Sequence, residues 1–85
     1  MLAANSGNAE IVRLLIERGA NVNAAENKRG QTALMWAAAE GHSDVVRLLI
    51  ERGADAKAVS KTGYSALAFA VNKNDAASVK ALLAA

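Results

Sequence analysis

The chain has 85 residues, of which 53% are apolar, but it holds only one Trp, one Tyr and one Phe. A chain of this size forms one small domain with a thin core. Its net charge of +2 is far weaker than the concentrated basic face of a nucleic-acid binder, and the absence of Cys excludes disulfides and thiolate chemistry. No apolar stretch is long enough to cross a bilayer and no signal peptide is visible, so we expect a soluble chain whose compartment the sequence leaves open.

The sequence repeats itself with a period of 33 to 34 residues. A shift of 34 lays "IVRLLIERGA" at 11–20 on "VVRLLIERGA" at 45–54, and a shift of 33 lays "GQTALMWA" at 30–37 on "GYSALAFA" at 63–70. Such a period is typical of a solenoid whose units bury their apolar faces by stacking. The longer first period predicts one extra residue in the stretch 24–27.

A short first helix is expected in each unit. Thr32 and Ser65 are suited to the N-cap position, because their side-chain oxygens can accept from free amides, and Ala-rich stretches follow to Glu40 and Lys73. The residues expected to end these helices tolerate the left-handed conformation: Gly7, Gly41 and Asn74.

A second helix is expected from about residues 9, 43 and 76, with apolar residues at i, i+3 and i+4 facing a core and a glycine, Gly19 or Gly53, ending it. Charged residues at helical spacing predict a solvated, salt-bridged outer face: Glu10, Arg13, Glu17, Asp44, Arg47 and Glu51.

The last unit has Ser78 and Ala81 where the middle unit has Val45 and Leu48. We interpret this loss of apolar area as the capping of a terminal face.

The segment 27–59, "NKRGQTALMWAAAEGHSDVVRLLIERGADAKAV", resembles a full ankyrin repeat, with its G-x-T-P-L-H-x-A-A-x-x-G-H pattern, its V-V-x-L-L-L helix and its G-A-D turn. Residues 1–26 resemble a repeat without its opening turn, and 60–85 one that stops after its second helix, within a single domain over 1–85. The family pattern has Pro and His where this chain has Ala33 and Met35, so we expect Met35 to pack in place of the His, with Met1 stacked on it.

The resemblance implies an all-α solenoid of stacked antiparallel helix pairs with hairpin-like turns. It also implies a protein-binding module without a catalytic centre, cofactor or metal ion. Its partner contacts lie mainly on the hairpin tips and the exposed face of the first helices, and the matching residues are Asn5, Ser6, Lys28, Arg29, Gln31, Ala39, Glu40, Lys61, Thr62, Tyr64, Asn72 and Lys73.

Trp36 shares its column with Leu2 and Phe69, which favours a core position, but a half-covered Trp36 is also a candidate partner anchor. In either case its indole N–H is expected to find a hydrogen-bond partner. Tyr64 has two readings as well, a contact residue at the tip or a residue that packs on the neighbouring turn.

Positive charge on successive tips, from Lys28, Arg29 and Lys61, favours an acidic protein partner. His42 shares its column with Asn8 and Asp75, which predicts hydrogen bonding to the local backbone rather than metal binding or catalysis.

The glycines form no phosphate-binding loop and the carboxylates are expected on exposed faces, so we predict no enzyme activity. The alternative hypothesis is that the chain is a fragment of a longer or engineered array. It would then form a homodimer or a domain-swapped assembly through open repeat ends that expose Leu2 and Ala3.

Overall fold

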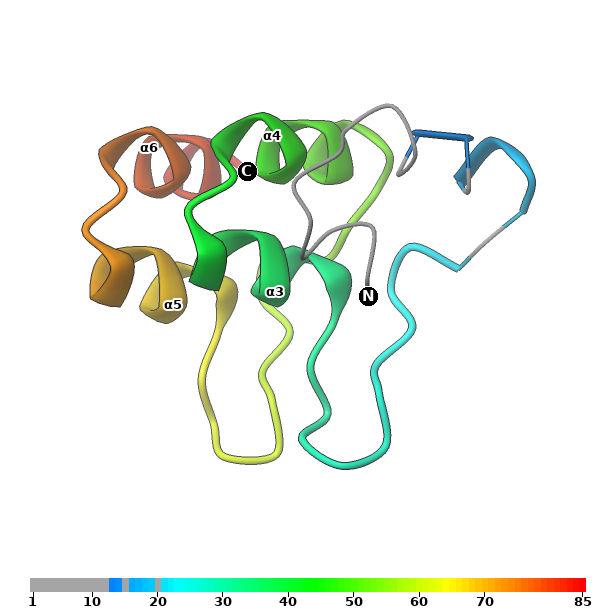
Figure 1. Ribbon diagram of the computed structural model, residues 1–85, viewed down its shortest axis with the longest axis horizontal. Helices are drawn as coiled ribbons and strands as arrows, with labels where there is room; N and C mark the ends of the chain where they lie inside the picture. The colour runs from blue at the N-terminus through cyan, green and yellow to red at the C-terminus, as the bar shows by residue number, and fades with distance from the viewer. Residues whose placement is uncertain (1–12, 15, 20) are drawn as a thin grey trace.

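The computed structural model describes residues 13–14, 16–19 and 21–85 (Figure 1). It shows four complete helices, α3 (Ala33–Glu40), α4 (Ser43–Glu51), α5 (Ala66–Lys73) and α6 (Ala76–Ala84). The first helices α3 and α5 lie side by side in one layer, and the second helices α4 and α6 lie in the other (Figure 1). The predicted stack of antiparallel helix pairs is confirmed.

Two hairpin-like turns project from the layer of α3 and α5 (Figure 1). Each is closed by one isolated antiparallel bridge, Ala25 with Thr32 and Val59 with Ser65. No helix in the described part of the chain is long and apolar enough to span a membrane.

The predicted caps fix the ends of α3 and α5. The hydroxyl of Thr32 accepts from the backbone N–H of Met35 at 3.4 Å, and that of Ser65 accepts from Ala68 at 3.3 Å. At the other end, Gly41 and Asn74 have φ angles of 73° and 64°, in the left-handed region. Gly7, the third residue of that column, lies outside the described residues.

The core runs through both layers of the stack. Met35 is 1% exposed, which confirms the expectation that it packs where the family pattern has His; Met1 lies outside the described residues. The other buried apolar residues are Leu34, Ala37, Ala38, Val45, Val46, Leu48, Leu49, Ala66, Ala70 and Leu82.

The interpretation of Ser78 as part of a capped terminal face is wrong. Ser78 is 0% exposed, like Val45 in the same column, because this column faces the interior of the stack. Its hydroxyl donates to the carboxylate of Asp75, which supplies the hydrogen bond that a buried polar group needs. Ala81 is half-buried against the core.

The extra residue of the first turn lies at its tip. The N–H of Glu26 donates to the carbonyl of Gln31 at 3.0 Å, and the N–H of Ser60 donates to that of Tyr64 at 2.9 Å. The first pair encloses one more residue than the second, so the extra residue lies within 27–30. The stretch predicted from the sequence overlaps this tip only at its last residue, because Ala25 and Val59 form equivalent bridges and the 34-residue register therefore still holds at Glu26.

The outer faces of the second helices are exposed as predicted, but their ion pairing differs. No ion pair joins Asp44, Arg47 and Glu51 along α4. Within the described ranges, the ion pair is formed by Arg52 and Glu17, whose nearest nitrogen and oxygen are 3.5 Å apart. It connects successive repeats, and because its side chains are 38% and 49% exposed it contributes little stability.

Candidate functional site

The tips of the two hairpins are joined to each other. The N–H of Lys61 donates to the carbonyl of Arg29 at 2.8 Å, and the ammonium of Lys61 donates to the carbonyl of Asn27. Gly30 permits this approach, because a Cβ atom there would lie 3.0 Å from Cγ of Lys61 and 3.2 Å from its backbone nitrogen. The tips therefore form one continuous ridge.

The carboxylate of Glu26 organises the first tip. It accepts hydrogen bonds from the backbone N–H groups of Arg29 at 2.6 Å, Lys28 at 2.9 Å and Gln31 at 3.4 Å. Desolvation acts to raise the pKa of Glu26, but the bonds from Arg29, Gln31 and Lys28 and the charge of Arg29 outweigh it and lower the pKa below 4.5. The carboxylate is turned to the backbone, while the side chains of Lys28 and Arg29 are exposed.

Ser60 has the corresponding role in the second tip. It is 5% exposed, and its hydroxyl accepts from the N–H of Tyr64 at 3.2 Å and lies 3.0 Å from the hydroxyl of Thr62. These contacts fix the backbone at Tyr64, just before α5 begins.

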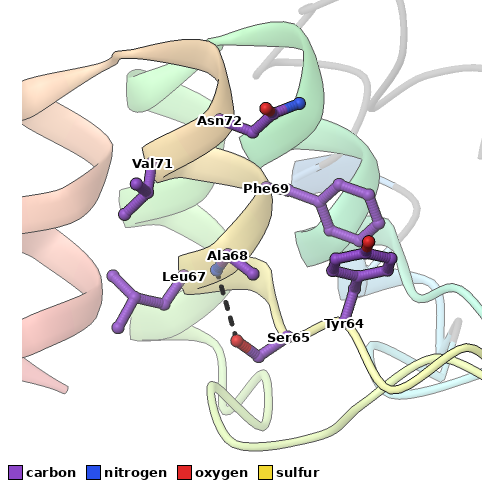
Figure 2. A pocket seen from close by; sticks show the side chains of 7 residues that line it. All are labelled: Tyr64, Ser65, Leu67, Ala68, Phe69, Val71 and Asn72. Atoms are coloured by element: carbon purple, nitrogen blue, oxygen red, sulfur yellow. Dashed lines mark hydrogen bonds between the residues drawn. The ribbon is translucent and has the colours of Figure 1, made fainter.

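Tyr64 combines an exposed ring with a fixed position. Its ring is tilted by 46° against the ring of Phe69, with centroids 5.7 Å apart, and the residue is 55% exposed. Figure 2 shows the two rings together on one side of α5. The sequence reading placed the packing of Tyr64 on the neighbouring turn, whereas the ring contact observed is with Phe69 of the same repeat. The reading of Tyr64 as a contact residue stays a prediction.

A shallow groove of about 730 Å³ runs over the exposed face of α5. Small residues form its middle, with the aromatic pair on one side and two aliphatic side chains on the other (Figure 2). Its lining residues are Tyr64, Ser65, Leu67, Ala68, Phe69, Val71 and Asn72.

The family model for ankyrin repeats, in three copies, matches residues 1–85. The chain belongs to the ankyrin-repeat family. Ankyrin repeats generally mediate interactions between proteins, and the family typically consists of non-enzymatic scaffolds. Among curated proteins the comparison finds no match.

Most of the sequence-predicted contact residues of this ankyrin domain are exposed. The exposed ones are Lys28, Arg29, Glu40, Lys61, Thr62, Tyr64, Asn72 and Lys73. Gln31 and Ala39 are half-buried, and Asn5 and Ser6 lie outside the described residues.

Two of the predicted contact lysines also hold the ankyrin stack together. Lys61 joins the hairpin tips, as described above. The stem of Lys73 lies over Gly41, where a Cβ atom would come within 3.3 Å of its Cγ and Cε atoms. Their aliphatic stems are therefore partly committed to packing, as is common for long charged side chains.

Trp36 is half-buried at the edge of the core. The expectation that its indole N–H finds a partner is wrong among the described residues, since Nε1 is buried there without a hydrogen bond. A buried, unpaired donor costs about 1 to 3 kcal/mol. Because Nε1 is covered, Trp36 can offer a partner only ring surface, not a hydrogen bond.

Asn23 is a structural residue that sequence reasoning missed. Its side-chain oxygen accepts from the N–H of Asp55 at 2.6 Å, and its amide donates to the carbonyl of Gly53 at 3.2 Å. It thereby ties the turn of one ankyrin repeat to the turn of the next. The period aligns Asn23 with Lys57, so the repeat comparison gave no signal for this role.

The side chains of His42 and Asp75, which share one column of the repeat, do not cap the helices that follow them. His42 and Asp75 are the N-cap residues of α4 and α6, and neither side chain accepts the capping hydrogen bond. For Asp75, predicted to bond to the backbone, the partner is the hydroxyl of Ser78. In the described ranges, no three His, Cys, Asp or Glu side chains gather to hold a metal ion.

Proposed function

We propose that this ankyrin domain binds a protein partner with the ridge of hairpin tips and the exposed face of α3 and α5. The proposal rests chiefly on the exposure and fixed position of Tyr64. This residue is 55% exposed, and its ring packs against Phe69 beside the groove. A Tyr offers a large contact area at a low entropic cost, and Tyr is enriched among residues that dominate binding energy.

The backbone of the proposed surface is ordered before binding. Hydrogen bonds inside each tip, and those from Lys61 to the first tip, fix the backbone that bears the proposed contact residues. A preordered surface loses little conformational entropy when a partner docks, so more of the contact energy appears as affinity.

The charge of the ridge favours an acidic partner. The side chains of Lys28, Arg29 and Lys61 are exposed there, whereas the carboxylate of Glu26 is engaged by backbone amides. Complementary charge raises the rate of association and disfavours basic partners. Binding should therefore weaken as the salt concentration rises.

The experiment selects a partner for the full chain from a proteome-wide display library and compares variants of the chain against the purified partner. Tyr64→Ala should weaken binding by about tenfold or more, as expected for a central aromatic contact. The control is Arg47→Ala, an exposed change on α4 in the other layer, which should stay within about twofold. Equal effects of the two changes would remove Tyr64 from the surface.

The alternative hypothesis of self-association through the first repeat rests on Leu2 and Ala3, which lie outside the described residues. It stays a prediction. Light scattering over a hundredfold range of concentration tests it, because a dimer would dissociate on dilution.

A further inference from the structure

The first helices of the middle and last repeats differ in what covers them. Leu34 and Ala38 of α3 are 1% and 0% exposed. The residues in the same columns of α5 are Leu67, which is half-buried, and Val71, which is 60% exposed. In Figure 2 these two side chains point away from Tyr64 and Phe69, on the opposite side of α5.

The second helices show the same difference. Val46 of α4 is 0% exposed, whereas Val79 of α6, in the same column, is only partly buried. Leu83 is 67% exposed, whereas Ile50 in its column is half-buried. We refer to Leu67, Val71, Val79 and Leu83 as the C-terminal face.

In the middle repeat these columns lie under a following repeat. There α5 packs against α3 and α6 packs against α4, and the buried positions of α5 are the small residues Ala66 and Ala70. The C-terminal face repeats the aliphatic pattern of the covered columns, with Val71 in place of the smaller Ala38. A capping repeat would instead carry polar residues on its outer face.

The C-terminal face also has a shallow hollow between its two helices. A groove of about 260 Å³ lies between α5 and α6, and Val71 and Val79 are among its lining residues. Ser78, the polar residue of α6 that could have capped the stack, is buried on the inner side.

We propose that the C-terminal face is a stacking interface for a further ankyrin-type helix pair, which presents small residues to it as Ala66 and Ala70 present theirs within the chain. The same columns of the middle repeat lie against such a pair, and Leu34, Ala38 and Val46 are buried there. This inference concerns the end of the stack. Leu67 and Val71 also line one side of the groove on α5, whereas Tyr64 and the hairpin tips are not part of the C-terminal face.

The test extends the full chain by one repeat. Ala85 falls in the column of Arg52, so a second copy of residues 53–85 joined after Ala85 continues the period of 33. Val71→Glu is introduced into the 85-residue chain and into the extended chain, and urea unfolding and helicity are measured for each. The control is Ala77→Glu, because the same column holds the exposed Asp44 in the covered middle repeat.

The proposal predicts that the extension adds helicity and raises the urea midpoint. Val71→Glu should then lower the folding equilibrium constant of the extended chain by about tenfold or more, since it buries a charge, and change that of the original chain little. Ala77→Glu should act equally in both, and Val71→Ala, which copies Ala38, should preserve the gain.

Three results would overturn the proposal. The first is an extension that adds no helicity, and the second is a Val71→Glu effect that is equally small in both chains. The third is an original chain that dimerises and loses its dimer on Val71→Glu while the extension adds nothing, because the occupant would then be a second copy meeting the same face.

Discussion

The N–H of Lys61 donates to the carbonyl of Arg29 across 2.8 Å, so the tips of successive hairpins are bonded backbone to backbone. This hydrogen bond brings the backbones of the two hairpins so close together that only a residue without a side chain fits between them. That residue is Gly30, with a φ angle of 68°. The ridge proposed as a partner surface depends on this close approach.

Gly30→Ala should destabilise the domain more than Gly63→Ala. Both glycines have positive φ angles, so each change costs about 1 to 2 kcal/mol for the backbone conformation. Only at Gly30 does the new Cβ meet Lys61, whereas nothing lies within 4 Å at Gly63. Urea unfolding of both variants measures the difference, and equal losses would mean that the tips can separate without cost.

Asn23→Ala should destabilise the stack by about 1 to 2 kcal/mol, because it removes two hydrogen bonds to the next repeat. Asn21→Ala is the matched control, since the bond that the Asn21 side chain makes within the described ranges is a local one, accepted from the N–H of Asn23. Its cost should be smaller. Thermal unfolding of both variants decides whether the connection between repeats is energetically significant.

Ser78→Ala should destabilise the domain by about 1 to 2 kcal/mol, because the buried hydroxyl donates to the charged carboxylate of Asp75. The check is a double-mutant cycle with Asp75→Ala, which isolates the energy of the pair from other effects of each change. Strictly additive changes would show that the hydroxyl gains nothing from this carboxylate.

Glu26 should make the first tip sensitive to acid. Its pKa is lowered in the folded chain, so its stabilising effect is present above the unfolded value of 4.5 and is lost as pH falls through the lower folded pKa. Glu26→Gln should therefore lower the melting temperature at pH 7, and the gap from wild type should close in acid. A gap that stays constant down to pH 2 would contradict this role.

Local signals were enough to predict the helix pairs. Thr32 and Ser65 cap helices with their own side chains, and Gly41 ends one through its own backbone conformation, so each feature is readable at its own position. The 33- to 34-residue period then predicts that the pairs stack.

Contacts between repeats could not be predicted in this way. The bonds of Asn23 to the next turn depend on which atoms meet after stacking. Ser78 was misassigned because a column comparison reveals a change of polarity but not the direction in which the column faces. The lack of an acceptor for the N–H of Trp36 among the described residues has the same origin, since the geometry of its neighbours decides whether an acceptor is within reach.

Amide hydrogen exchange of the full chain, with and without its selected protein partner, tests the proposed binding surface most directly. We expect binding to slow exchange at the hairpin tips, residues 27–31 and 61–64, and along α5, while α4 keeps its free-state rates. Slowed exchange confined to α4 and α6, with the tips unchanged, would contradict it and assign recognition to the other layer.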